Sequence, residues 1–112
     1  MDVSSLASAP PFTTKDGSTI RELHHTGVQS LAEATLTTGR STERHYHRAA
    51  EEIYFVLEGE GDIELDGERR RIGVGDAVLI PPGAWHEITA VSDLRFLCCC
   101  APPYSHDDTF FD

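Results

Sequence analysis

The sequence predicts an all-β fold, a sandwich or barrel of short antiparallel strands. Apolar runs of strand length recur along the chain, and turn signals rich in Gly and Pro separate them. No stretch has the apolar periodicity of a long helix, and no internal repeat is apparent. His45 and His47 are a further indication of a β scaffold, because side chains two residues apart lie on the same face of a strand and can share one site.

The elements follow one another in three parts. Residues 1–18 are rich in Ser, Ala, Pro and Thr, and we expect an N-terminal arm or edge strand there. The barrel is expected over 19–101, and a polar C-terminal tail over 102–112 after Pro102-Pro103. Within the barrel, periodicity and apolar runs predict extended segments at 28–37, 45–47, 53–57, 62–65, 77–80, 85–90 and 94–100.

Turn residues set the boundaries of these segments. Asp66-Gly67 supplies the positive-φ positions of a tight hairpin. Pro81-Pro82-Gly83 stops the segment that begins at Ala77, since Pro cannot donate to a sheet. The one basic run, Arg69 to Arg71, lies beside the hairpin and is expected on the surface, where it could protect a strand edge.

Length and charge limit the possible functions. With 112 residues the chain is expected to form one domain, and its formal net charge of −10 argues against binding nucleic acid. No run is long enough to cross a membrane, and the first residues lack the pattern of a secretory signal. We therefore expect a cytoplasmic protein.

The three cysteines, Cys98, Cys99 and Cys100, are consecutive and suit a reducing compartment. In a strand Cys98 and Cys100 share one face, which is expected to be the inner one, while Cys99 lies on the other. Small buried apolar residues are the simplest interpretation.

The histidines and acids predict a metal site. On a strand the imidazoles of His45 and His47 start roughly 6.6 Å apart and can converge on one point. Imidazole binds iron, manganese, nickel, copper and zinc, and a carboxylate with a third histidine, His86, would complete the ligand set. Glu51 and Glu52 both lie at a suitable distance along the chain.

The spacing of these residues resembles the two motifs of the cupin superfamily, G(X)5HXH(X)3-4E(X)6G and G(X)5PXG(X)2H(X)3N, over residues 39 to 90. The first motif is matched by Gly39, His45, His47, Glu52 and Gly59, and the second by Gly75, Pro81, Gly83 and His86. The final motif residue, usually Asn, is Ala90 here; it is not a metal ligand in the family.

The resemblance implies a jelly-roll β-barrel, also called a double-stranded β-helix, with one divalent metal ion inside. The implied ligands are His45, His47, Glu52 and His86. Glu52 is preferred to Glu51 because only Glu52 places Gly59 in the motif register. The ion could be Fe(II), Mn, Ni, Cu or Zn.

Two further residues are candidates for catalysis. Tyr54 shares strand parity with Glu52, so it could point into the cavity as a proton donor or substrate contact; the alternative is a buried aromatic residue. His106, in the tail, could fold over the barrel mouth or onto a partner subunit; the alternative is a surface residue.

By this resemblance we expect a mononuclear non-haem metal enzyme that acts on a small chelating or anionic oxygenated metabolite, as dioxygenases do. One alternative is a redox-neutral sugar or sugar-acid isomerase or lyase that uses the metal as a Lewis acid. The other is a non-catalytic module that binds a small molecule. A homodimer is expected, and neither nucleic acid nor a membrane is expected as a partner.

Overall fold

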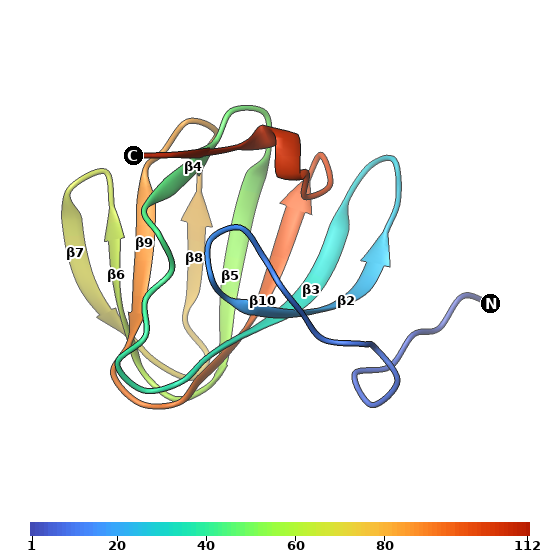
Figure 1. Ribbon diagram of the computed structural model, residues 1–112, viewed down its shortest axis with the longest axis horizontal. Coiled ribbons are helices and arrows are strands. Elements are labelled where there is room, and N and C mark those ends of the chain that lie inside the picture. Colours follow the sequence, from blue (N-terminus) through green and yellow to red (C-terminus); the bar gives the residue numbers. More distant parts are fainter.

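The computed structural model describes all 112 residues and contains two antiparallel β-sheets packed face to face (Figure 1). The first sheet contains, in spatial order, β1 (Phe12–Thr13), β2 (Thr19–His25), β3 (Ser30–Leu36), β10 (Leu94–Ala101), β5 (Glu51–Glu58) and β8 (Ala77–Ile80). The second contains β11 (Thr109–Phe111), β4 (His45–His47), β9 (His86–Ala90), β6 (Gly61–Leu65) and β7 (Glu68–Ile72). The predicted all-β jelly-roll barrel is therefore confirmed.

No long helix is present, as the sequence predicted; the one helical element is the 3-10 turn η1 (His106–Asp108). None of the helical segments is long and apolar enough to pass through a bilayer. The basic run lies on β7, an exposed edge strand, where Arg71 pairs with Asp62 and Glu60. The hairpin before it has Asp66 and Gly67 at φ of 48° and 87°.

The inward side chains change character along each central strand. On β5 the buried positions run Glu52, Tyr54, Val56, and on β9 they run His86, Ile88, Ala90. One end of the space between the sheets is thus an apolar core, in which Val56 and Ile88 pack within one cluster. The other end is polar and contains the histidines.

Gly59 is a position that only glycine can occupy. Its φ is +83°, and an added Cβ would overlap the backbone carbonyl oxygen of Asp93. Gly59 directly follows β5 and begins the turn, so it fixes where the strand that carries Glu52 stops.

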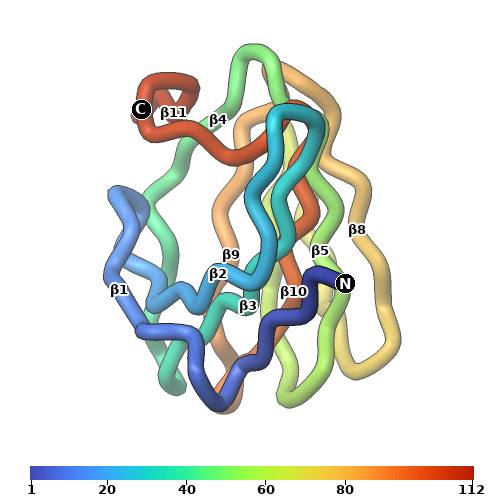
Figure 2. Tube along the Cα trace, turned by 90° about the vertical axis from the view of Figure 1, so that its right-hand side faces the viewer, coloured from blue at the N-terminus to red at the C-terminus, as the bar shows by residue number.

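Both terminal segments lie against the barrel. Figure 2 shows the C-terminal segment beside β4 and the N-terminal segment crossing the barrel near β2. β11 pairs with β4 in the register Thr109↔His47 and Phe111↔His45, so the tail extends the second sheet. β1 pairs with β2, and the turn between them, residues 14–18, leads back into the barrel mouth.

Candidate metal centre

Three histidines meet between the sheets. His45 and His47 point inward from β4, and His86, at the start of β9, is the register partner of His45. Their exposed fractions are 1%, 4% and 1% in that order. One ligand nitrogen from each lies within 4.8 Å of the others. The grouping agrees with the site expected from the sequence.

Backbone carbonyls orient each imidazole. The Nδ1 atoms of the three rings lie next to carbonyl oxygens: His45 with Glu43 at 2.7 Å, His86 with Ala84 at 2.9 Å, and His47 with Asp108 at 3.3 Å. Because a carbonyl can only accept a hydrogen bond, Nδ1 is the protonated nitrogen and donates it. In the neutral imidazole, Nε2 then carries a free lone pair, as a metal ligand requires.

Glu52 adds a carboxylate to the group. Its side chain is buried, and its Oε1 lies 3.3 Å from Nε2 of His47 and 3.4 Å from Nε2 of His86. The thiol of Cys100 donates to the other oxygen, Oε2, at 3.2 Å. Glu51, by contrast, is exposed on the opposite face of β5.

Two of these atoms are buried without a hydrogen-bond partner: Oε1 of Glu52 and Nε2 of His86. A buried polar atom without a partner costs free energy, and native proteins rarely leave one unsatisfied. A carboxylate oxygen and imidazole lone pairs directed into one space are the donor set that binds divalent transition metals. The residues therefore fit a metal ion.

The local electrostatics also suit a metal ion. Burial, with a contribution from His86, lowers the pKa of His45 to about 4, so this imidazole is neutral at pH 7. Burial works against protonation of His47 as well, but the carboxylate of Glu52 outweighs it and raises the pKa of His47. Burial raises the pKa of Glu52, yet its two histidine neighbours reverse this and lower it overall, so Glu52 is ionised.

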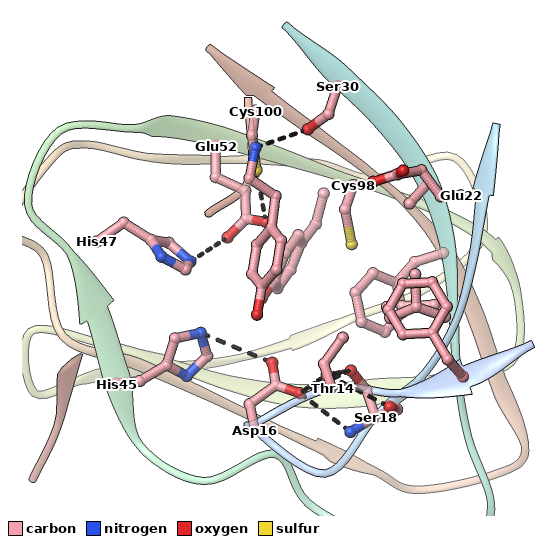
Figure 3. A pocket seen from close by; sticks show the side chains of 17 residues that line it. Thr14, Asp16, Ser18, Glu22, Ser30, His45, His47, Glu52, Cys98 and Cys100 are labelled. Atoms are coloured by element: carbon pink, nitrogen blue, oxygen red, sulfur yellow. Dashed lines mark hydrogen bonds and ion pairs between the residues drawn. The ribbon is translucent and has the colours of Figure 1, made fainter. Parts of the chain in front are cut away.

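The candidate metal centre opens into a cavity between the two sheets, drawn in Figure 3. Its volume is about 40 Å³. Apolar residues such as Ile20 and Phe96 line one part, and His45, His47 and Glu52 line another. The lining contains no Lys or Arg, so an anion would meet no permanently charged cationic side chain there.

Tyr54 and Cys98 both line this cavity. Tyr54 is 3% exposed, and its ring packs against Phe96 with 4.7 Å between the ring centres. Burial raises the pKa of the Tyr54 hydroxyl and of the Cys98 thiol, so both keep their protons at neutral pH. Tyr54 is therefore available as a hydrogen-bond donor, whereas Cys98 is a weak nucleophile.

The C-terminal tail contributes Tyr104 and Asp108 to the surroundings of the site, whereas the sequence had pointed to His106. Tyr104 lines the cavity, whereas His106 is exposed on η1 and lies outside the cavity lining. The carboxylate of Asp108 accepts hydrogen bonds from the backbone N–H groups of Arg48, Ala49 and Ala50. Asp108 thus anchors the loop that connects His47 to Glu52. A role for His106 at the site stays a prediction.

Sequence reasoning missed Asp16. This residue lies in the turn between β1 and β2, and its Oδ2 lies 3.7 Å from Nε2 of His45. In Figure 3 Asp16 faces His45, while Glu52 lies beside His47. The dipeptide Asp16-Gly17 signals a turn, but no local pattern indicates that this turn folds into the barrel mouth.

Comparison with known proteins agrees with this fold. Residues 32–100 match the family of cupin domains. An uncharacterized protein from Methanocaldococcus jannaschii is 47% identical over 106 residues, which covers 88% of this chain and 85% of that protein. An oxalate-binding protein from Thermotoga maritima is 34% identical over 79 residues, which covers 69% of this chain and 65% of that protein.

A solved structure agrees in fold. KdgF from Halomonas sp. superposes with a TM-score of 0.84 at 22% sequence identity, and the match covers 91% of this chain and 94% of that one. Identity at this level reports the arrangement of strands alone.

Proposed function

This chain belongs to the cupin family, and from that premise we propose that it is a metal-dependent enzyme acting on a small chelating oxygenated metabolite, in the manner of a dioxygenase. His45, His47, Glu52 and His86 would hold one divalent ion. The observation that carries the proposal is the pair of buried, unpartnered atoms, Glu52 Oε1 and His86 Nε2, within the three-histidine group.

A bound Fe(II) or other redox-active divalent ion would supply the site with Lewis acidity and, with oxygen, redox chemistry. The chain's own residues supply position and exclusion of water. The carbonyls of Glu43 and Ala84 hold two imidazoles in the ligand tautomer, and Tyr54 offers a protonated hydroxyl to a bound molecule. The apolar part of the lining keeps water away from the reacting groups.

The ligand class follows from the cavity. The space is small, and its lining has no Lys or Arg, so a phosphorylated or large substrate would find no such side chain to pair with and little room. A compact molecule with two oxygen donors would gain its affinity from the metal ion. The oxalate-binding relative, whose ligand is a small oxygen chelator, supports this class.

That same relative favours a second candidate, a module that binds a small chelator without turnover. Elemental analysis of anaerobically purified protein, followed by oxygen uptake with chelating hydroxy acids, diketones and oxalate, separates the two. The enzyme predicts a redox-active metal and oxygen uptake that depends on one of these compounds. Tight binding of a chelator with no oxygen uptake and no product would support the binding module instead.

We also propose a homodimer formed through the outer face of the first sheet. Ile53, Phe55 and Leu79 are exposed there by 40%, 39% and 53%. Ile53 pairs with Leu79 and with exposed Cys99, so these side chains form one patch across β10, β5 and β8, called here the outer patch. Contiguous apolar surface of this kind is typical of protein interfaces.

The three thiols, Cys98, Cys99 and Cys100, are free, and Cys99 is exposed. Free exposed thiols persist in reducing compartments and oxidise in secreted proteins. We therefore propose a cytoplasmic location.

A further inference from the structure

We propose that Asp16 determines which chelator the cavity takes. Its carboxylate accepts a hydrogen bond from a hydroxyl group of the bound molecule, so the site favours hydroxyl-bearing chelators over dicarboxylates. This inference rests on the proposed function, since it concerns the ligand of the same metal centre.

The two oxygens of Asp16 have different surroundings. Oδ1 accepts three hydrogen bonds: from the Thr14 hydroxyl at 2.6 Å, the Ser18 N–H at 3.0 Å and the Ser18 hydroxyl at 2.7 Å. These bonds fix the carboxylate in one orientation. Oδ2 is left facing the metal centre, 3.7 Å from Nε2 of His45. A fixed acceptor directed into a ligand cavity is an arrangement that recognises a donor.

The turn that carries Asp16 is itself held in place. Thr14 and Ser18 close it with a backbone hydrogen bond of 3.0 Å, and the backbone oxygen of Asp16 accepts one from the N–H of Glu43 at 2.8 Å. Glu43 also orients the ring of His45 through its carbonyl. Asp16 is therefore tied to the segment that positions a proposed ligand, and its place relative to the centre is well defined.

Charge favours a hydroxyl group at this position. The acidic residues of the lining are Asp16, Glu22 and Glu52, and no Lys or Arg is present. The two carboxylates next to the histidines, Glu52 and Asp16, would already balance the charge of a divalent ion. A dicarboxylate would then add two further negative charges, one of them next to Asp16, in a space where like charges repel strongly. A hydroxyl group in the same place would instead donate a charge-assisted hydrogen bond.

Asp16→Asn tests the proposed role of the Asp16 carboxylate with little change in the shape of the side chain. The three donors around Oδ1 require an acceptor, so the new amide oxygen should remain there and the NH2 group should face the cavity. The variant thus replaces an acceptor by a donor. Asp107→Asn is the matched control, because Asp107 is an exposed carboxylate on η1 outside the cavity lining.

The experiment uses the full chain loaded with cobalt(II), whose visible absorption reports ligand binding. Metal content is measured first, and glycolate and oxalate are then titrated into each protein. Both molecules have two carbons, and glycolate carries a CH2OH group where oxalate has its second carboxylate. Because cobalt(II) has its own preference between them, the quantity compared is the ratio of the two dissociation constants in each variant against the parent protein.

We expect equal metal content in all three proteins. In Asp16→Asn the ratio should shift toward oxalate by about tenfold or more, the usual effect of one charge-assisted hydrogen bond, and Asp107→Asn should leave it unchanged. An unchanged ratio in Asp16→Asn with full metal content overturns the inference and leaves the proposed function standing. Loss of metal in Asp16→Asn alone also overturns it, since Asp16 would then be a ligand. A parent protein that binds no metal overturns the proposed function, and this inference with it.

Discussion

The loop between two proposed ligands depends on a single carboxylate in the tail, and Asp108→Ala tests that dependence. Asp108 accepts hydrogen bonds from three backbone N–H groups, those of Arg48, Ala49 and Ala50, between 2.9 and 3.2 Å. Arg48 and Ala49 are exposed, so water can replace their lost partner, whereas Ala50 is 2% exposed. One buried N–H left without a partner costs about 1–3 kcal/mol. We expect Asp108→Ala to lower the free energy of unfolding by about that amount.

The same loop connects His47 to Glu52, so the substitution should also weaken metal binding. Loss of groups that orient metal ligands typically costs about 10- to 100-fold in affinity. Urea unfolding is measured with a chelator present, because bound metal would add stability by mass action; metal affinity is measured by competition with a chromophoric chelator. Asp107→Asn, one residue away and exposed, is the control. If the free energy of unfolding of Asp108→Ala lies within about 0.5 kcal/mol of the parent value and metal affinity is unchanged, the tail does not hold this loop.

The remaining predictions concern protonation, assembly and backbone. The pKa of His47 is raised, and its imidazolium form cannot bind metal. Metal affinity should therefore fall by about tenfold for each pH unit below that pKa. A metal affinity that does not change in competition titrations from pH 8 to 5.5 would contradict this prediction. If the proposed homodimer forms through the outer patch, Phe55→Glu should give a monomer by light scattering, whereas Val74→Glu, at an exposed apolar residue outside the patch, should leave the assembly unchanged. Gly59→Ala should cost about 3 kcal/mol or more in urea unfolding. Gly39→Ala, which also has positive φ but open space around it, should cost about 1 kcal/mol, and equal losses would refute the steric argument.

The strands and the histidine group could be predicted because local rules decide them. Strand parity places His45 and His47 on one face. The choice of Glu52 over Glu51 rests on the motif register of Gly59, and the structure agrees with it, since Glu52 is buried and Glu51 is exposed. Asp66-Gly67 has the positive φ values that its composition suggested. In each case the determining interaction lies within a few residues along the chain, so the sequence pattern carries it.

Asp16 and Asp108 could not be predicted, for the opposite reason. Each lies in a terminal segment that composition describes only as an arm or a tail, and each acts on residues far away in sequence. Asp108 bonds to Ala50, 58 positions away, and Asp16 faces His45 across the cavity. Such contacts depend on how the termini pack against the finished barrel. The family motifs, which lie in the barrel strands, contain no information about them.

This division has a consequence for function within the cupin fold. The four proposed ligands lie on strands whose spacing the barrel constrains, so the spacing of the motif residues already indicates the metal chemistry proposed for the chain. The selectivity that we propose depends instead on the rest of the cavity lining, which includes Asp16 of the turn between β1 and β2 and Tyr104 of the tail. Both positions lie in segments whose sequence the barrel constrains least. We therefore expect substitutions at residues 12–18 and 102–109 to alter ligand selectivity without loss of metal, and substitutions of the histidines to abolish metal binding.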